Sequence, residues 1–206
     1  MEINNKNSRK EYKFLLTEKE IYKLKIFYGE LLVPLFPNRT IESLYMDTVN
    51  LEIYKLSKNT DVNKFKLRFR TYPKNDKKIY KEIKSNKSTG KEKKSVDTEY
   101  NSLDDIKFEI YNNYFLEPSL ITKYEREYFK LDSIARLTID SSLQFKLPKN
   151  VSLLGKYIFE DLFIVELKLL NSLTTDLSQY FFKSPEAFSK YENGIEKLYS
   201  EKIIQS

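Results

Sequence analysis

The stretch KFKLRFRTY, residues 64–72, carries a cation at every second position. The cations are Lys64, Lys66, Arg68 and Arg70, and apolar residues stand between them. A β-strand sends alternate side chains to opposite faces, so this pattern predicts a strand with one face made only of cations. Like charges that face each other across neighbouring strands repel. Such a face therefore predicts an anionic ligand.

The missing residue types limit the chemistry of this site. The sequence has no cysteine, which excludes disulfides, thiolate metal sites and cysteine nucleophiles, and no histidine, which excludes the commonest general base and zinc ligand. Chemistry must depend on Lys, Arg, carboxylates and hydroxyls. A hard cation held by oxygen ligands, such as Mg²⁺ or Mn²⁺, is compatible with this set.

Composition predicts a folded chain with an anionic partner. The 14 Phe and 16 Tyr exclude a disordered chain despite 32% charged residues, and 36 Lys+Arg against 30 Asp+Glu give a net charge of +6. The polar N-terminus lacks the apolar core of a signal peptide, and no apolar run approaches a membrane span. The expectation is a soluble cytoplasmic protein.

Alternating patterns predict about eight strands. The clearest are residues 8–16, 40–48, 64–72, 78–85, 120–131, 134–145 and 160–170. Strands that follow one another without regular helical crossovers favour an antiparallel sheet, and eight such strands can close into a barrel. We therefore expect an α+β fold, an eight-stranded antiparallel β-barrel with flanking helices. No repeat or linker divides the chain, so residues 1–206 are expected to form one domain.

Helical signals predict the flanking helices. Thr17 offers an N-cap with Glu20 three residues later, and apolar residues recur at helical spacing up to Pro34. Similar spacing predicts a helix within residues 102–115, and a C-terminal helical segment is expected from about residue 174 to 199. Residues 86–102, rich in lysine and polar residues, are predicted to form a mobile basic loop.

The charged faces of the strands allow two interpretations. In one, the apolar face packs on the helices and the charged face is wet. In the other, the charged faces point into the barrel, because charges stand in the middle of apolar runs such as FIVELKLL. There, Leu162, Ile164, Glu166 and Lys168 share one face, so Glu166 and Lys168 are expected well inside the fold.

A cationic lumen would need water and a polyanion. Two unit charges about 4 Å apart repel by about 4 kcal/mol at an effective dielectric constant of about 20. Arg suits fork-like contact with phosphate oxygens, Lys supplies point charge, and carboxylates could hold a divalent metal that bridges the phosphates. The predicted ligand is a linear polyphosphate or a nucleoside triphosphate.

Eight motifs along the chain resemble one family. In order they are RKEYKF, IESLYMDT, KFKLRFRTY, YKEIKS with a lysine-rich loop, KYEREYF, ARLTID, IVELK and FSKYENGI. Their order and spacing resemble the VTC domain, the polyphosphate polymerase domain of the vacuolar transporter chaperone. This family lies within the CYTH-like superfamily of triphosphate tunnel metalloenzymes.

The resemblance implies an eight-stranded antiparallel tunnel that binds triphosphate or polyphosphate with Mn²⁺ or Mg²⁺. Polymerase members transfer the γ-phosphoryl of ATP to a growing inorganic polyphosphate chain. The implied catalytic, phosphate-gripping residues are Lys13, Arg68, Arg70, Lys84, Arg126, Arg136 and Lys190. Further implied phosphate-binding residues are Lys66, Lys93 or Lys94, Tyr124, Lys168 and Ser189. Glu166 would be the metal ligand.

Alternative roles exist for several of these residues. Arg68 and Arg70 could be surface cations, Lys190 could be a solvated helix residue, and Glu166 could pair with a neighbouring arginine. Three further acids fit metal binding less well and are expected to orient cations, namely Glu11, Glu82 and Asp140.

The resemblance also leaves alternative functions. The chain has no SPX-type domain, membrane segment or histidine, so regulation by inositol phosphates and attachment to a membrane are not supported. A metal-dependent triphosphatase and a catalytically silent polyphosphate-binding module are the alternatives. Binding of single-stranded nucleic acid would need aromatics on the cationic face, and Phe65 and Phe69 point the other way. The expected partners are therefore ATP and inorganic polyphosphate, not nucleic acid.

Overall fold

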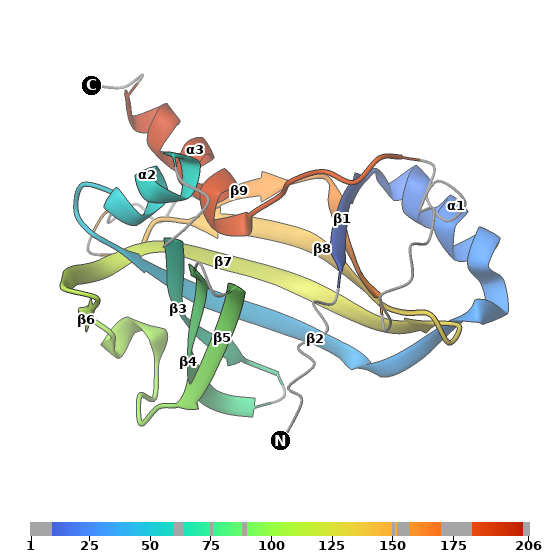
Figure 1. Ribbon diagram of the computed structural model, residues 1–206, viewed down its shortest axis with the longest axis horizontal. Helices are drawn as coiled ribbons and strands as arrows, with labels where there is room; N and C mark the ends of the chain where they lie inside the picture. Colours follow the sequence, from blue (N-terminus) through green and yellow to red (C-terminus); the bar gives the residue numbers. More distant parts are fainter. Residues whose placement is uncertain are drawn as a thin grey trace. The chain divides into compact units, whose positions relative to one another are not determined.

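The computed structural model describes residues 10–59, 64–74, 76–87, 90–149, 151, 157–169 and 183–203 (Figure 1). The strands are β1 (Glu11–Leu16), β2 (Leu32–Asp47), β3 (Lys64–Tyr72), β4 (Asp76–Lys87), β5 (Gly90–Asp97), β6 (Glu109–Tyr111), β7 (Tyr114–Leu131), β8 (Ala135–Lys146), β9 (Tyr157–Glu160) and β10 (Phe163–Leu169). The helices are α1 (Glu18–Tyr28), α2 (Glu52–Asn59) and α3 (Lys190–Ile203), with short 3₁₀ turns η1 (Gly29–Leu31) and η2 (Leu103–Asp105). No helix within these ranges is both long and apolar enough to cross a membrane.

The strands form one hydrogen-bonded ladder in an α+β fold, as predicted. Their order is β1-β10-β8-β7-β2-β3-β4-β5, and β6 and β9 pair with β7 and β8 at the side. Every pair whose register is described is antiparallel. The order has two ends, β1 and β5, so the ladder of the described residues is an open sheet. Closure into an eight-stranded barrel stays a prediction.

The chain divides into two compact units. The first comprises residues 1–38, 125–142 and 160–188, and the second comprises residues 39–124, 143–159 and 189–206. The long strands β2, β7 and β8 contribute residues to both. The single domain expected over residues 1–206 stays a prediction.

In the first unit, α1 packs on β1, β10 and parts of β7 and β8. The predicted capping box is present, because the Thr17 hydroxyl accepts from the Glu20 amide at 3.3 Å and Glu20 accepts from the Thr17 amide at 2.7 Å. The helix ends at Tyr28, before the predicted limit at Pro34, since Gly29 takes a positive φ of 46°. Apolar residues of α1 and the strands then form the core, including Leu24, Phe14, Leu137 and Val165.

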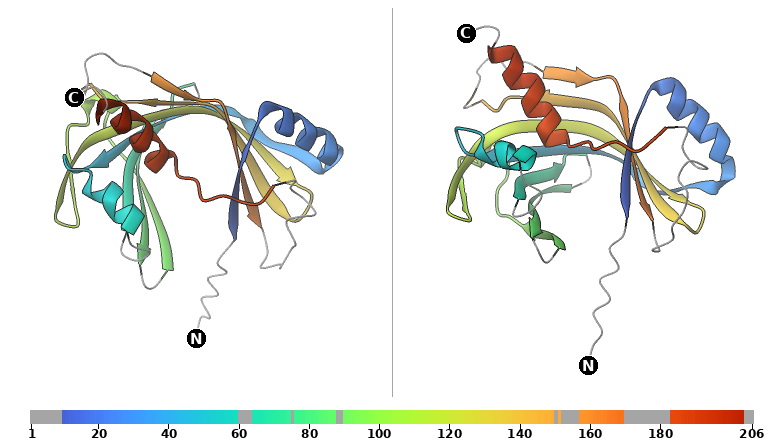
Figure 2. Two further views of the ribbon diagram at one scale, coloured as in Figure 1. Left: turned by 90° about the horizontal axis from the view of Figure 1, so that it is seen from above. Right: turned by 45° about the horizontal axis from the view of Figure 1, so that its top comes forward.

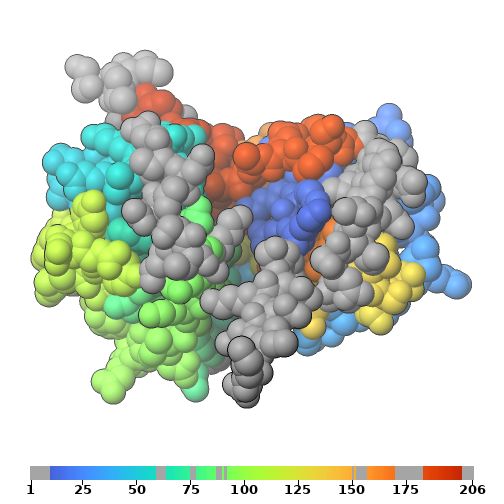
Figure 3. All heavy atoms as spheres, in the orientation of Figure 1, coloured from blue at the N-terminus to red at the C-terminus, as the bar shows by residue number. Residues whose placement is uncertain are grey.

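In the second unit, α2 and α3 lie side by side in Figures 1 and 2, and Figure 3 shows them adjoining at the surface. Asp47, the last residue of β2, fixes both helices. Its Oδ1 accepts from the Ile53 amide at 2.8 Å, its Oδ2 accepts from the Tyr54 amide at 3.0 Å, and Tyr191 of α3 donates its hydroxyl to Oδ2. This buried carboxylate therefore ties α3 to the start of α2.

Two predicted elements in the middle of the chain differ from the structure. The basic loop expected over residues 86–102 contains the strand β5, which forms because β4 offers it a full row of partners. The helix expected within residues 102–115 is instead η2 followed by the β6–β7 hairpin. Asn112 and Asn113 turn this hairpin with φ values of 50° and 63°. Asparagine tolerates such positive φ values better than most residues, so the turn overrides the helical spacing.

The C-terminal helix begins later than expected. Residues 183–189 are not helical, and α3 starts at Lys190. Ser189 caps the helix, because its hydroxyl accepts from the Glu192 amide at 3.3 Å. The part of the expected helix from residue 174 to 182 lies outside the described residues. The helix α2 was not predicted.

Candidate functional site: a cationic face and a carboxylate face

The strand β3 has the two different faces that its alternation predicts. One face is buried in the apolar core of the second unit through Phe65, Leu67 and Phe69. The other face carries Arg68 and Arg70. The register sets Arg68 between Tyr45 of β2 and Glu82 of β4, so the neighbouring strands supply polar partners on this face.

Three cations share one carboxylate on this face. Arg68 donates from Nε to Glu82 Oε2 at 2.7 Å, and its Nη2 lies 2.6 Å from the same oxygen. Lys93 donates to Glu82 Oε1 at 2.7 Å, and Arg70 Nη1 lies 3.6 Å from Oε2. We call Arg68, Arg70, Glu82 and Lys93 the arginine cluster.

Hydroxyl groups provide further acceptors for the two arginines. Arg68 donates from Nη1 to the Tyr45 hydroxyl at 2.9 Å. Arg70 donates to Ser43 Oγ and to the Tyr124 hydroxyl, both at 3.3 Å. Hydrogen bonds weaken as they lengthen, so Arg68 is held more tightly than Arg70.

The arginine cluster is largely buried and carries excess positive charge. The exposed fractions of the Arg68, Arg70 and Glu82 side chains are 15%, 8% and 6%. The interpretation of the two arginines as surface cations is therefore wrong. Three cations against one carboxylate leave two positive charges without a carboxylate partner among the described residues. The Lys93 side chain is 48% exposed and solvated, but the two arginines are largely buried, and buried charges require counter-charges. Among the described residues that the sequence predicted for the site, this cluster is the one best suited to bind an anion.

The excess charge also changes the ionisation of neighbouring groups. Burial alone would raise the pKa of Glu82, but the opposing effect of Arg68, Arg70 and Lys93 is larger, so the pKa is lowered to about 2. Burial likewise raises the pKa of the Tyr45 hydroxyl, and Arg68 and Arg70 outweigh this effect and lower it to about 8. Both shifts favour negative charge beside the cations.

Two more cations, Lys66 of β3 and Lys190 of α3, lie near the start of α3. Lys66 of β3 donates to Ser189 Oγ at 2.9 Å and to Glu192 Oε1 at 2.5 Å. Lys190 is half-buried, with its ammonium 4.6 Å from the centre of the Tyr124 ring. Lys190 is therefore not a solvated helix residue, and Ser189 has a structural role as the cap of α3.

Close packing holds α3 in place. A Cβ atom on Gly194 would lie 2.6 Å from side-chain carbons of both Leu120 and Phe145. Only glycine fits at this approach of the helix to β7 and β8. The position of Lys190 thus depends on a glycine one turn further along the helix.

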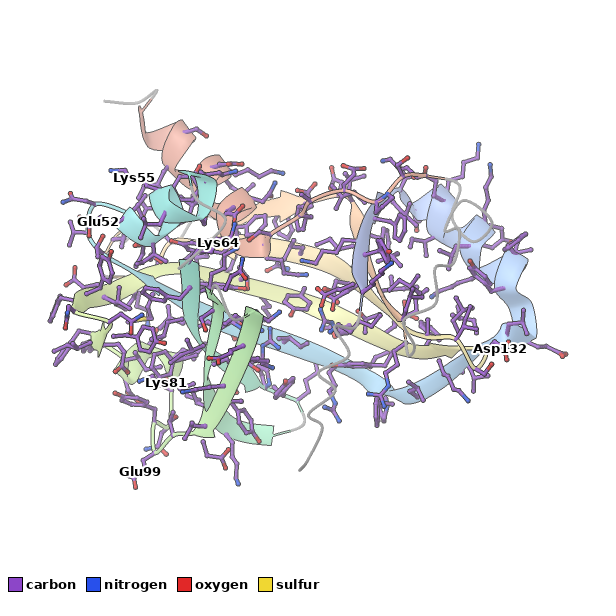
Figure 4. All side chains as sticks on the ribbon, in the orientation of Figure 1. Glu52, Lys55, Lys64, Lys81, Glu99 and Asp132 are labelled. Atoms are coloured by element: carbon purple, nitrogen blue, oxygen red, sulfur yellow. The ribbon has the colours of Figure 1, made fainter. Side chains whose placement is uncertain are left out.

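The remaining predicted lysines of the second unit lie on opposite faces. The register sets Lys84 beside both Lys66 and Lys93, on the cationic face, where Lys84 is exposed. Lys94 stands opposite Ile83, on the other face of β5. Of the two alternatives in the lysine-rich segment, Lys93 is the one that joins the arginine cluster. Figure 4 shows Lys81 on β4, whose ammonium lies 2.8 Å from a Glu109 oxygen.

A second polar face lies in the first unit, on β1 and β10. Lys168 lies 2.6 Å from Glu166 and 3.7 Å from Glu11, and Lys13 lies 3.9 Å from Glu11. Lys13 also donates to the Phe188 carbonyl at 2.8 Å. We call Glu11, Lys13, Glu166 and Lys168 the carboxylate cluster. Its two carboxylates balance the charge of its two lysines.

Glu166 is the least exposed member of the carboxylate cluster, with 13% of its side chain exposed. Burial raises its pKa, but Lys168, Arg126 and Lys13 together lower it, so the carboxylate is ionised. Its partner is Lys168 rather than an arginine. The prediction that Lys168 lies well inside the fold is wrong, because 47% of its side chain is exposed. A long lysine side chain reaches solvent even where its strand is buried.

The two predicted arginines of β7 and β8 differ. Arg126 forms a bidentate pair with Asp140, at 2.5 and 2.7 Å, and its side chain is 14% exposed. Asp140 thus orients a cation, as expected. Arg136 stands opposite Lys168 in the register and is exposed. On β8, between Arg136 and Asp140, the buried hydroxyl of Thr138 has no hydrogen-bond partner in the described part of the chain.

The carboxylates fit a metal only in part. Among the described residues, no three acidic side chains gather as a metal-binding group. Glu166 and Glu11 could each offer an oxygen to a metal whose other ligands are phosphates and water, the usual arrangement of Mg²⁺ at phosphate sites. The residues therefore fit a metal that arrives with its phosphate ligand.

Sequence reasoning did not assign Ser43 and Tyr45 to the site. Their alternation in SLYMD placed them together on one face of the predicted strand. The missing signal was the pairing of β2 with β3, which sets Ser43 opposite Arg70 and Tyr45 opposite Arg68. Glu192, the partner of Lys66, follows Ser189 by three residues, a spacing typical of a helix start.

Comparison with solved structures shows the fold. The chain is similar to the PH1819 protein of Pyrococcus horikoshii OT3, with a TM-score of 0.56, 14% identity, and coverage of 93% of this chain and 99% of that one. A putative adenylate cyclase from Vibrio parahaemolyticus gives a TM-score of 0.49, 13% identity and coverage of 96% and 98%. The capping enzyme triphosphatase of mimivirus gives 0.44, 11%, and 98% and 91%. Comparison with curated proteins gives no match.

Comparison with protein families gives the identity of the chain. The model of the VTC domain matches residues 8–107 and again residues 92–199, so the two matches together span nearly all of the sequence. They include every residue of the arginine and carboxylate clusters. The resemblance predicted from the eight motifs is confirmed: the chain belongs to the VTC domain family.

Proposed function

We propose that this protein is a polyphosphate polymerase that transfers the γ-phosphoryl of ATP to a growing inorganic polyphosphate chain. The observation that carries the proposal is the arginine cluster, in which Arg68, Arg70 and Lys93 share the single carboxylate of Glu82. The two uncompensated charges favour a ligand with several negative charges close together. A triphosphate or polyphosphate meets this requirement, and membership of the VTC domain family supports the choice.

The phosphate-binding residues fall on the two polar faces. On the cationic face, Arg68 and Arg70 would bind phosphate oxygens by charge-assisted hydrogen bonds, and Lys66, Lys84, Lys93 and Lys190 would add charge. Tyr124 and Ser189 would supply hydroxyl contacts. On the other face, phosphate-binding roles are proposed for Lys13, Arg126, Arg136 and Lys168. The eight-stranded tunnel expected for the family, and the cytoplasmic location, belong to the same proposal.

The chemistry requires positioning more than proton transfer. Phosphoryl transfer has a loose transition state whose charge lies on the equatorial phosphate oxygens, which cations stabilise. The attacking group is a terminal phosphate, which is already an oxyanion at neutral pH. Breaking the bond between the β-γ bridging oxygen and the γ-phosphorus while the acceptor oxygen attacks that phosphorus gives ADP and a chain longer by one phosphate. No histidine is needed.

A divalent metal, Mn²⁺ or Mg²⁺, would neutralise phosphate charge when it is bound. Glu166 is the proposed ligand, because its carboxylate is half-buried, ionised and on a polar face. Lys168 now holds that carboxylate at 2.6 Å and would have to release it. Asp140 would keep Arg126 oriented toward phosphate without touching the metal.

Incubation of the protein with ATP and Mn²⁺ tests the proposal. A polymerase yields ADP and long-chain polyphosphate, which gel electrophoresis detects. Free phosphate or pyrophosphate without chains would instead show a metal-dependent triphosphatase. Unchanged ATP, together with measurable binding of polyphosphate, would show a catalytically silent binding module.

A further inference from the structure

Glu82 occupies the hydrogen-bond donors that a phosphate group would use. Its Oε2 lies 2.7 Å from Nε and 2.6 Å from Nη2 of Arg68, so one edge of this guanidinium is already bound to a carboxylate. The Tyr45 hydroxyl takes a bond from the third nitrogen, Nη1, at 2.9 Å. The other Glu82 oxygen accepts from Lys93. A phosphate can form a fork-like contact with the Nε–Nη2 edge of Arg68 only by displacing Glu82.

Arg70 offers a contrast two residues along the same strand. Its bonds to Ser43 and Tyr124 are both 3.3 Å long, and its closest distance to Glu82 is 3.6 Å. Its partners are neutral hydroxyls, which bind a guanidinium more weakly than a carboxylate does. Arg70 is therefore the arginine that exchanges its partners for phosphate at lower cost.

We propose that Glu82 is an internal counter-anion, which a phosphate must displace to reach Lys93 and the Nε–Nη2 edge of Arg68, and that the cost of this displacement sets an affinity threshold for anions on the cationic face. The cationic face would then retain chains of three or more phosphates and release orthophosphate. This inference rests on the proposed function and gives a reason why an anion would need several contacts to be retained.

The length dependence follows from the spacing of the cations. Same-face residues on a strand are about 7 Å apart, so Lys66, Arg68 and Arg70 form a row about 14 Å long. Displacing Glu82 opposes binding once, whatever the length of the ligand. A chain that also reaches Arg70 and Lys190 gains contacts that offset the displacement. Orthophosphate spans one position of the row and has no such compensation.

The competition does not depend on pH in the neutral range. The pKa of Glu82 is lowered to about 2 because the three cations outweigh the effect of burial, so the carboxylate stays charged. Substitution, rather than a change of pH, is therefore the way to remove the counter-anion.

The test compares wild type with Glu82→Gln, using calorimetric titration with orthophosphate and with tripolyphosphate at neutral pH without metal. The matched control is Glu109→Gln, which removes a carboxylate 2.8 Å from Lys81 in the same unit but away from the arginine cluster. We expect Glu82→Gln to bind both anions about tenfold more tightly or better, because a nearby like charge is lost. Glu109→Gln should leave both affinities unchanged.

The outcomes separate the inference from the proposed function. Unchanged or weaker binding of tripolyphosphate to Glu82→Gln would show that Glu82 only orients Arg68, and would overturn the inference. The proposed function would still stand if the wild-type protein binds tripolyphosphate. A wild-type chain that binds neither tripolyphosphate nor polyphosphate overturns both.

Two further variants keep the inference testable if Glu82→Gln fails to fold. Glu82→Asp keeps the charge but draws the carboxylate away from Arg68, so we expect an intermediate gain in tripolyphosphate affinity. In an Arg68→Ala background, Glu82→Gln should gain much less than in wild type, because most of the competition is for Arg68. An equal gain in both backgrounds would contradict a competition for this arginine.

Discussion

The two polar faces are built from the same residue types but balance their charges differently. In the arginine cluster, Glu82 serves three cations, whereas in the carboxylate cluster Glu11 and Glu166 match Lys13 and Lys168 one to one. The nearby pair of Arg126 and Asp140 is also balanced. A balanced face can exist without a ligand, but a face with excess buried charge is stabilised by an anion.

The difference in charge balance predicts that the two faces contribute differently to phosphate binding and to turnover. The cationic face of the second unit should provide most of the affinity for phosphate. The carboxylate cluster should contribute less affinity but should set the response to metal, because it holds the ionised, half-buried carboxylate of Glu166. Variants in one face should therefore change binding, and variants in the other should change turnover.

The largest effect is expected from the double substitution Arg68→Ala with Arg70→Ala. Hydrogen bonds to charged groups contribute roughly 1.5–3 kcal/mol each, so the double variant should lose about 100-fold or more in affinity for tripolyphosphate. Titration calorimetry measures the loss, and circular dichroism checks that the fold is retained.

A pair of exposed lysines provides the control for this double variant. Lys78 and Lys149 carry the same total charge in the same unit, and their side chains are 65% and 72% exposed. Their double substitution by alanine should reduce affinity only slightly, since exposed charges are screened. Equal losses in the two double variants would mean that net charge, rather than the arginine cluster, binds the anion.

The next effect concerns the carboxylate cluster. Glu166→Gln should reduce metal-dependent turnover of ATP by about 100-fold, because it removes the negative charge that would hold the metal, and should leave tripolyphosphate binding without metal within about threefold. Glu127→Gln is the control, because Glu127 pairs with Lys25 of α1 at 2.8 Å in the same unit. Unaltered turnover in Glu166→Gln would remove Glu166 from the metal role.

The cationic face was predictable from the sequence because its signal is local. The alternation of β3 alone separates Phe65, Leu67 and Phe69 from the arginines, and the structure buries them on opposite faces. No local sequence signal decided whether the charged face of β3 is solvated or buried. This depended on partners from β2, β4 and β7, whose register no single strand determines.

The missed elements depend on partners distant in sequence or on turns. The strand β5 is almost wholly polar, so only its pairing with β4 identifies it. The start of α2 takes its cap from Asp47, six residues before the Ile53 amide that donates to it. The Asn112-Asn113 pair was a readable hairpin signal, but the spacing of apolar residues around it favoured a helix.

A smaller effect is expected from Gly194→Ala, which tests how the cationic face depends on α3. The new methyl group would meet Leu120 and Phe145, so the variant should be destabilised by roughly 1–3 kcal/mol, partly offset by the higher helix propensity of alanine. Thermal unfolding measures this change. Ser200→Ala, at an exposed site of the same helix, should be neutral or slightly stabilising. A stable Gly194→Ala with normal tripolyphosphate affinity would show that α3 can shift without affecting Lys66 and Lys190.

The smallest signal comes from Tyr45, one tyrosine among 16, which reports the excess charge directly. Its pKa is lowered from 10.0 to about 8, so one tyrosinate should appear near pH 8 in ultraviolet difference absorbance and vanish in Tyr45→Phe. Because the folded value lies below the unfolded one, the ionised hydroxyl stabilises the fold above about pH 10, and this contribution is lost as the pH falls through 8. Tripolyphosphate should raise the pKa of Tyr45 by compensating Arg68 and Arg70. A titration that tripolyphosphate leaves unmoved would place the bound anion away from the arginine cluster, and the contrast between the two faces would then not explain binding.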